Sequence, residues 1–210
     1  MQRLSSCWNI ACRLITLPEI PAPEAPMPRH LTLAELNAGL PEILASPDDN
    51  GTLRAIVIRP SKTQRADLGT CEISLALGNH GDHWVMGCWK STEDGQPHPD
   101  VQICLMNARC IGLIAQERAN WPPAGDNLFI DMDLTPANTP PGTRLAIGSA
   151  LIEITDTPHN GCASFIERYG RDACIFVNTG EGKKLRLRGI YARVVQDGRI
   201  TAGDRLVKVV

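Results

Sequence analysis

The feature that most constrains this chain is a succession of short β-type runs separated by turn residues. From residue 52 onward, Gly, Pro, Asn or Asp stands in nearly every gap between these runs. Many short strands with few helices favour a closed or nearly closed barrel over a parallel α/β sheet. We therefore predict a mainly β fold, with a hairpin turn at Asp197-Gly198 and strands in the runs TLRAIVIRP, CEISLALG, VQICLMN, NLFIDMDL, TRLAIGSALIEIT, ACIFVNT, IYARVV and RLVKVV.

Three stretches interrupt the β pattern with helical spacing. In LTLAELNAGLPEILAS, Thr32 and Glu35 fit a capping box, and the pattern predicts a short helix interrupted or ended near Pro41. NARCIGLIAQERAN carries apolar residues on one side of a helix. NGCASFIERYG predicts a short helix that begins near Asn160 and has Gly170 past its end.

Length and charge set the limits on domains and partners. The chain has 210 residues, enough for one sizeable domain, and we assign residues 30–210 to it. Residues 1–29 hold a proline-rich stretch that we expect to be extended and disordered, without a secretory signal. The net charge of −2 and the few aromatic residues argue against nucleic acid as a partner. No apolar stretch is long enough to span a membrane. Because we expect no export signal, we expect a cytoplasmic protein.

The eight cysteines do not form a disulfide or zinc pattern. They are scattered through apolar runs, which is typical of buried small hydrophobic residues, and a reducing cytosol suits them. The nearest metal-like group is His80, His83 and Cys88, which lacks a fourth ligand and paired spacing, so we do not favour zinc there. The cysteines stand at positions 7, 12, 71, 88, 104, 110, 162 and 174.

Cys162 differs from the others in its surroundings. It follows a turn with Pro158, Asn160 and Gly161 and opens a predicted helix. Unpaired N–H groups and the positive end of a helix dipole favour a thiolate, and His159 with Arg168 or Arg171 can add positive charge. Two interpretations stay open from the residues alone: a buried structural cysteine or a reactive one.

Three further stretches are candidate ligand sites. LGNHGDHW combines two flexible glycines with Asp82 and two histidines, and PPAGDNLFI places Gly125, Asp126 and Asn127 in a turn before a strand. A basic stretch near the C-terminus predicts an anion-binding strand face with Arg186 and Arg188 on the same side. Each has a structural alternative, a surface turn or a solvated sheet edge. The basic residues are Lys183, Lys184, Arg186, Arg188 and Arg193.

The order of these stretches resembles the MOSC domain family, named for the C-terminal domain of molybdenum cofactor sulfurases. The resemblance runs from about Ile56 to Val209 and rests on GNHGDHW, PAGDNLFI, GTRLAIGSALIEIT, PHNGCASF and RGIYARVVQDGRITAGD. At three positions the chain departs from the family pattern: His83 stands where arginine is frequent, Asp126 where glutamate is usual, and Gly161 where proline is common.

The resemblance implies a MOSC-type β-barrel that binds molybdenum cofactor (molybdopterin). It maps the family's single characteristic cysteine onto Cys162, as persulfide carrier or metal ligand. We expect the cofactor to lie near Arg188 or Arg193 and the Gly81-Asp82 turn, with His83 and Asn127 in the matching motifs. The implied activity is sulfur carriage or molybdenum-dependent reduction of N-hydroxylated compounds, and the alternative is a non-catalytic cofactor-binding or structural barrel with inert cysteines.

The length of the chain bears on sulfur supply. Fused members of the family carry a pyridoxal-phosphate (PLP) desulfurase domain, and 210 residues leave no room for it beside the barrel. We therefore expect no PLP site in this chain. If it carries sulfur, a separate PLP-dependent cysteine desulfurase is the implied donor.

Overall fold

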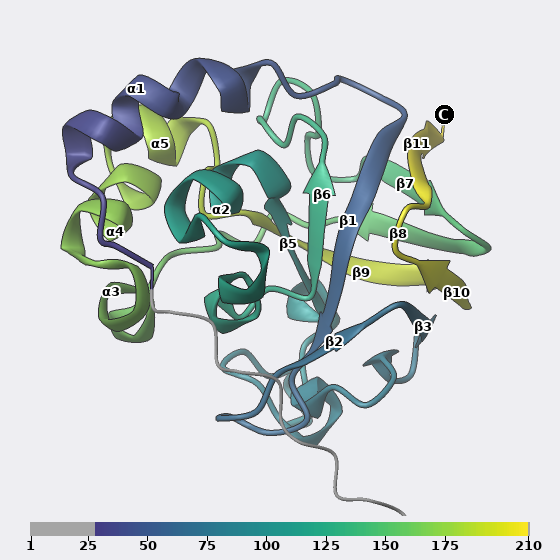
Figure 1. The fold of residues 1–210 in the computed structure, drawn as a ribbon. Coiled ribbons are helices and arrows are strands. Elements are labelled where there is room, and N and C mark those ends of the chain that lie inside the picture. Colours follow the sequence, from purple (N-terminus) through teal and green to yellow (C-terminus); the bar gives the residue numbers. More distant parts are fainter. Residues whose placement is uncertain (1–27, 210) are drawn as a thin grey trace, which may run out of the picture.

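Seven strands close into a β-barrel in the computed structural model, which describes residues 28–209 (Figure 1). Around the ring, β1 is followed by β6, β5, β9, β8, β7 and β11, and the pairing of Gly51 with Leu206 returns to β1. β5 and β6 are parallel, and the other neighbours are antiparallel. The predicted mainly β barrel is confirmed. Its strands are β1 (Gly51–Ile58), β5 (Ile103–Asn107), β6 (Leu128–Asp131), β7 (Arg144–Ile147), β8 (Ala150–Ile154), β9 (Ile190–Gln196) and β11 (Arg205–Val209).

Apolar side chains fill both faces of the barrel wall. One buried cluster lies inside the ring and includes Leu53, Ile56 and Leu105. In a second buried cluster, the outward-facing side chains of Val57 and Phe129 pack against helices. Successive strand residues point to opposite faces, so a strand buried on both faces reads as a continuous apolar run. This is why IVI in β1 and ICLM in β5 show no alternation with polar residues.

The helices gather on one side of the barrel (Figure 1). The predicted capping box is present in α1, where Thr32 Oγ1 accepts from the Glu35 N–H and Glu35 accepts from the Thr32 N–H. The expectation that Pro41 ends this helix is wrong, because α1 continues to Leu44 and keeps Ile43 in the core. The helices are α1 (Leu33–Leu44), α2 (Ala108–Ala115), α3 (Ala163–Tyr169), α4 (Arg171–Asn178) and α5 (Gly180–Lys184).

The run ACIFVNT, predicted as a strand, belongs to α4 instead. Ala173, Phe176 and Val177 are buried against the helical cluster. Their spacing of three and four residues is that of one helix face. The prediction was wrong because a short apolar run carries too few residues to distinguish the two periods. The helices predicted over 107–120 and 160–169 are confirmed as α2 and α3, with shorter bounds.

A small second sheet lies beside the barrel and contains β10, β3 and β4. The predicted hairpin at Asp197-Gly198 is wrong, because β10 pairs with β3 and not with β9. The Asp197 carboxylate accepts from the Leu75 N–H at 2.8 Å, which ties this corner to the small sheet. The remaining elements are β2 (Ala66–Leu68), β3 (Thr70–Ser74), β4 (Gly78–Asn79), β10 (Gly198–Thr201), η1 (His83–Met86), η2 (Pro99–Val101), η3 (Arg118–Asn120) and η4 (Pro122–Ala124).

The N-terminal predictions fall largely outside the described part of the chain. Residues 1–27 of the proline-rich segment assigned to 1–29 are not among the described residues. Within residues 28–209, none of the helices has the length and apolar character needed to cross a bilayer.

We predict that Gly148→Ala destabilises the barrel far more than Gly142→Ala. Both glycines have positive φ, +57° and +88°, which costs an alanine about 1–2 kcal/mol. A Cβ at Gly148 would lie 2.3 Å from the Arg199 carbonyl oxygen, whereas one at Gly142 meets no atom within 4 Å. Overpacking should therefore add about 1–3 kcal/mol at Gly148 alone. Urea denaturation of both variants measures the difference, and equal losses would contradict the close packing at β7–β8.

Candidate functional site

A cavity of about 560 Å³ lies against the outer barrel wall, where the end of β1 meets the starts of β5 and β6. The loop after β1, the end of η4 with Gly125, and the loop before α3 close it. Among the described residues, no carboxylate side chain lines it, whereas five lysines and arginines do. Its wall consists of Arg59, Lys62, Arg65, His83, Trp89, Cys104, Ala124, Gly125, Pro158, His159, Asn160, Cys162, Ser164, Arg168, Arg188 and Tyr191.

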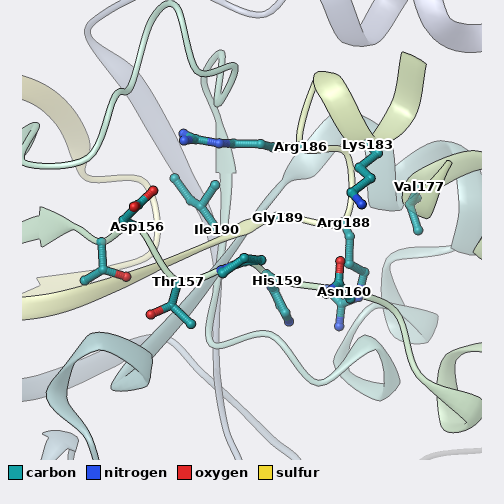
Figure 2. A pocket seen from close by; sticks show the side chains of 12 residues that line it. Asp156, Thr157, His159, Asn160, Val177, Lys183, Arg186, Arg188, Gly189 and Ile190 are labelled. Carbon is teal, nitrogen blue, oxygen red and sulfur yellow. The ribbon is translucent and has the colours of Figure 1, made fainter. Parts of the chain in front are cut away.

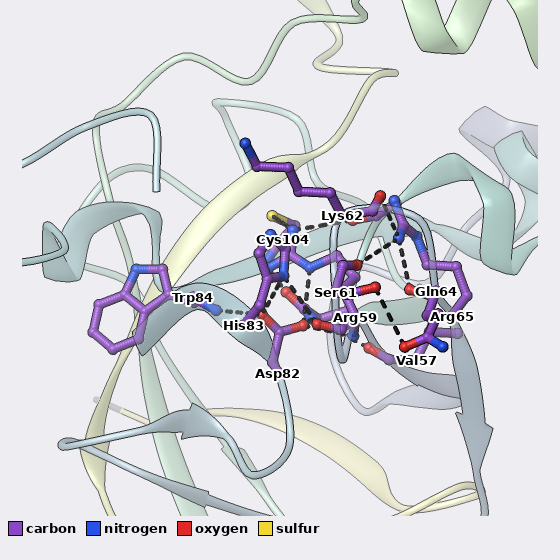
Figure 3. Close-up of polar contacts among 12 residues, drawn as sticks. Val57, Arg59, Ser61, Lys62, Gln64, Arg65, Asp82, His83, Trp84 and Cys104 are labelled. Atoms are coloured by element: carbon purple, nitrogen blue, oxygen red, sulfur yellow. Dashed lines mark hydrogen bonds and ion pairs between the residues drawn. The ribbon is translucent and has the colours of Figure 1, made fainter. Parts of the chain in front are cut away.

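Arg59, directly after β1, is held by a carboxylate behind the cavity wall (Figure 3). Its Nε and Nη2 donate to the two oxygens of Asp82 at 2.9 and 3.0 Å, and its N–H donates to Oδ2 at 2.9 Å. Asn127 adds a further hydrogen bond to Asp82 Oδ2 at 2.9 Å. Burial acts to raise the pKa of Asp82, but the hydrogen bonds and charge of Arg59 outweigh it and lower that pKa. Asp82 therefore stays ionised and orients Arg59.

Arg188 is buried, unlike the half-buried Arg59, and has its own carboxylate. Its Nη1 lies 2.8 and 3.0 Å from the two oxygens of Asp126, and its Nη2 donates to the Ala124 carbonyl at 3.1 Å. Burial alone would lower the pKa of Arg188, but Asp126 outweighs it and the pKa is raised. The same burial raises the pKa of Asp126. Asp126 is thus a partner of Arg188 and not a cavity-wall residue.

The strand face predicted for Arg186 and Arg188 does not exist. These residues lie in the turn between α5 and β9, and Arg186 has a positive φ of 56°. Such a turn breaks the two-residue alternation of a strand, so the two side chains have different surroundings. Arg188 is buried on Asp126, whereas Arg186 donates to the Thr139 carbonyl at 2.8 Å.

Cys162 is exposed and lines the cavity at the start of α3, where it is the N-cap residue. Partial burial acts to raise the pKa of its thiol. The N–H groups of Phe165 and Ser164, together with the charge of Arg188, outweigh this and lower the pKa. The structure therefore places the predicted thiol in solvent reach and under a positive field.

A second thiol in the same cavity has the opposite character. Cys104 in β5 is buried, and Arg59 Nη1 lies 3.5 Å from its Sγ. Burial raises the pKa of Cys104 to about 11, although Arg59 opposes the rise. Cys104 is therefore a neutral thiol at neutral pH, while Cys162 is the more acidic one.

An aromatic wall faces the cations. The Tyr191 ring lies 4.4 Å from the His159 ring and 6.3 Å from the exposed Trp89 ring, whose Nε1 donates to Tyr191 Oη at 3.2 Å. Burial, reinforced by Arg188 and Arg59, lowers the pKa of His159 well below its usual value. His159 is therefore neutral, and the expectation that it adds positive charge near Cys162 is wrong.

Three cations at the cavity have no carboxylate hydrogen-bonded to them among the described residues. Lys62 is exposed, and Arg65 and Arg168 are half-buried and donate to backbone carbonyls. Burial, with repulsion from Arg168 and Arg59, lowers the pKa of Arg65. These three side chains provide the excess positive charge of the cavity.

The structure brings together some of the residues singled out in the sequence and separates others. Cys162, Arg188 and His83 line the cavity. Gly81, Asp82 and Asn127 lie behind its wall, where Asp82 and Asn127 fix Arg59 and the β1–β6 junction. Arg193 lies elsewhere, half-exposed on β9, with Glu153 at 2.6 Å and Asp100 at 3.6 Å.

Sequence reasoning missed the cationic loop that follows β1. RPSKTQR places Arg59, Lys62 and Arg65 at three-residue intervals directly after a buried strand, and Pro60 marks the loop. The three-residue spacing of these cations is the sequence signal that could have indicated a cationic ligand-binding loop. Cys104, Tyr191 and Trp89 had no local signal, because tertiary contacts between distant segments bring them to the cavity.

The metal-like group His80, His83 and Cys88 is not assembled in the structure. His80 Nε2 lies 3.0 Å from Ser74 Oγ, and His83 Nδ1 lies 2.9 Å from the Arg59 carbonyl. The Cys88 thiol donates to the Lys90 carbonyl at 2.8 Å. Within residues 28–209, no three His, Cys, Asp or Glu side chains gather closely enough to hold a metal ion.

The fold and the cavity define a closed β-barrel protein with a cationic, thiol-bearing ligand site on its outer wall. The chain belongs to the MOSC domain family, whose model matches residues 92–207, more than half of the chain. This membership supports a molybdenum cofactor-associated role in general. A search of curated proteins found no match.

Solved structures share the fold at low sequence identity. YiiM from Geobacillus stearothermophilus is 16% identical with a TM-score of 0.51, and the match covers 76% of this chain and 75% of YiiM. The YuaD protein from Bacillus subtilis is 14% identical with a TM-score of 0.51, covering 75% of this chain and 94% of YuaD. A structure described as a hypothetical protein is 20% identical with a TM-score of 0.51, covering 76% and 69%.

We predict that iodoacetamide labels Cys162 with a pH midpoint below the ordinary thiol value of 9.0. Its lowered pKa means that the thiolate persists to lower pH, so its alkylation should set in at a lower pH than that of an ordinary thiol. Cys104 and Cys110, whose pKa values burial raises to about 11 and about 12, should stay unlabelled in the folded protein. Peptide mass spectrometry over a pH series gives the result for each cysteine. A midpoint at or above 9.0 for Cys162 would contradict the positive field described above.

We predict that Asp82→Asn costs about 3–5 kcal/mol of unfolding free energy, because it leaves Arg59, whose side chain is only 13% exposed, without its buried carboxylate partner. Asp100→Asn is the matched control. Its carboxylate pairs with Lys90 at 3.3 Å between side chains that are 31% and 29% exposed, so its loss should cost about 1 kcal/mol or less. Guanidinium denaturation compares the two. Equal small losses would mean that Asp82 is not needed to hold Arg59.

Proposed function

We propose that the cavity binds molybdenum cofactor, with the Cys162 thiolate directed to the metal end and the surface cations to the phosphate. One observation carries the proposal: an exposed, acidic thiol and five cationic side chains line the same cavity, which has no carboxylate among its described wall residues. A soft thiolate suits molybdenum, and guanidinium groups suit a phosphate.

The donor groups of the cavity fit such an anionic ligand. Arg65 Nε is buried and has no hydrogen-bond partner among the described residues, and the same holds for Arg188 Nε. Unpartnered buried donors are costly, and an anion that accepts from them relieves this cost. Arg59 and Arg188 already have their own carboxylates, so Lys62, Arg65 and Arg168 are the side chains left to neutralise a phosphate.

The bound cofactor supplies a redox-active metal, and the chain supplies the groups around it. In this proposal Cys162 Sγ binds as a thiolate, and Arg59 and Arg188 orient the ligand. Tyr191 and Cys104 hold protons at Oη and Sγ, since burial raises both of their pKa values. Trp89 donates to Tyr191 Oη and fixes its orientation.

Two activities fit this arrangement, and each has an observation in its favour. Reduction of an N-hydroxylated compound requires protons as well as electrons, and two neutral proton-holding groups line the cavity beside Cys162. Sulfur carriage requires that another protein can reach the thiol, and Cys162 is exposed. In the second case a separate PLP-dependent cysteine desulfurase would supply the sulfur, and a cytoplasmic location would suit it.

The rival proposal is a non-catalytic barrel with inert cysteines. It makes Cys162 dispensable, whereas both activities above require this thiol. Cys174 provides a matched control, because it is a half-buried cysteine on α4 that does not line the cavity.

We predict that Cys162→Ala protein, purified from a host that makes the cofactor, loses most of its molybdenum or its sulfane sulfur. Cys174→Ala protein should keep both, because its thiol lies outside the cavity wall. Elemental analysis measures the metal, and cyanolysis measures the total sulfane sulfur held by each protein. Metal loss supports the ligand role, and sulfur loss supports the carrier role. Wild-type protein that holds neither, or a Cys162→Ala variant that keeps both, would refute the proposal.

A further inference from the structure

A second, smaller cavity of about 190 Å³ adjoins the first, and Figure 2 shows the residues that line it. Pro158, His159, Asn160 and Arg188 line both cavities and thus form the partition between them. The rest of its wall comes from the turn between α5 and β9 and from the segment after β8. These parts, with the ends of α5 and β9 that flank the turn, contribute Lys183, Arg186, Gly189, Ile190, Thr155, Asp156 and Thr157, and α4 contributes Val177.

The turn after α5 explains why cations gather here. Arg186 adopts the left-handed conformation, and its carbonyl accepts from the Gly189 N–H at 2.8 Å. Gly189 has a φ of +108°, and a Cβ there would lie 2.2 Å from the Leu105 carbonyl oxygen. The turn therefore packs directly against the backbone of β5. Lys183, Arg186 and Arg188 line the cavity from this one short segment.

The charges around this cavity are not balanced by ion pairs. The Lys183 side chain is exposed and has no hydrogen-bond or ion-pair partner among residues 28–209, and Figure 2 shows its amine on the side of Arg188 and Asn160. Arg186 bonds the Thr139 carbonyl and no carboxylate. Among the described wall residues, Asp156 is the one acidic side chain, and it is exposed. Burial lowers the pKa of Arg186, and the charge of Asp156 opposes this shift without reversing it. The neighbouring Lys184, by contrast, pairs with Glu181 at 3.5 Å.

The neighbouring buried groups do not cancel this positive charge. Arg188 is 5% exposed, and its charge is matched by Asp126. His159 is neutral because its pKa is strongly lowered. The remaining charged wall residues are the cations Lys183 and Arg186 and the anion Asp156, so the net charge of the cavity wall is positive. The hydrogen-bond donors of the wall are an amine, a guanidinium and the Asn160 amide.

We propose that this second cavity is a binding site for a small inorganic oxyanion, separate from the cofactor cavity, with Lys183 and Arg186 as its charged ligands. Its size suits a tetrahedral ion such as phosphate or sulfate and not a cofactor. Charge-assisted hydrogen bonds from an amine and a guanidinium are the usual means of holding such an ion. The site does not depend on the proposed function of the first cavity.

A titration of the full chain with inorganic phosphate, measured by isothermal calorimetry at low salt, tests the proposal. Two double variants separate the cavities: Lys183→Ala with Arg186→Asn for the second, and Lys62→Ala with Arg65→Ala for the first. Asparagine is chosen at position 186 because it tolerates positive φ. Lys184→Ala is the matched control, since it removes a cation that does not line the cavity.

The Lys62/Arg65 variant should still bind phosphate, and adding the Lys183/Arg186 changes to it should weaken that binding by about tenfold or more. Adding Lys184→Ala instead should leave it within about twofold. Unchanged binding after the Lys183/Arg186 changes would overturn the proposal. So would loss of molybdenum from the Lys183/Arg186 variant with phosphate binding intact, because the cavity would then belong to the cofactor site. Thermal unfolding of each variant confirms that it is folded.

Discussion

The cavity depends on two ion pairs whose carboxylates are buried. Arg59 on Asp82 and Arg188 on Asp126 place guanidinium groups at the edge of a packed barrel, where an unpaired charge would be prohibitively costly. The carboxylates lie behind the wall, so the cations face the cavity while their partners do not. Asn127 couples the arrangement to the strands, because it bonds both Asp82 and the backbone of Val57. The positive field of the site is therefore built into the fold.

That field gives two thiols different chemistry within one cavity. Cys162 stands at a helix start with N–H groups directed at it, and its pKa is lowered. Cys104 lies on the barrel wall, where desolvation dominates even though Arg59 is close, and its pKa is raised to about 11. The contrast shows that a neighbouring cation is not sufficient for a reactive thiol. Solvent access and local backbone donors decide the outcome.

The sequence predicted most of the barrel strands correctly, but it misassigned two segments outside the barrel wall. Runs such as IVI and ICLM are strands because they are buried on both faces, and the capping box at Thr32 defines its helix locally. ACIFVNT and Asp197-Gly198 were misassigned because their local patterns fit two structures. In each case tertiary packing decided the structure. Phe176 packs into the buried helical cluster, so its segment is a helix, and β10 pairs with β3 instead of forming a hairpin with β9. Cys162 was found because its turn, helix start and polar neighbours lie together in the sequence.

By itself the sequence determined the mainly β class and the main helix starts, and it singled out Cys162 as the candidate reactive thiol, because each of these rests on short-range periodicity, capping or turn chemistry. Only the tertiary structure decided which charges surround that thiol. It placed Asp82 and Asn127 behind the wall, left the Arg193 side chain exposed outside the cavity and brought Arg59, Arg65 and Cys104 to the cavity. The reason is physical: electrostatic fields and desolvation depend on distances through space, and barrel closure sets these between segments far apart in the chain.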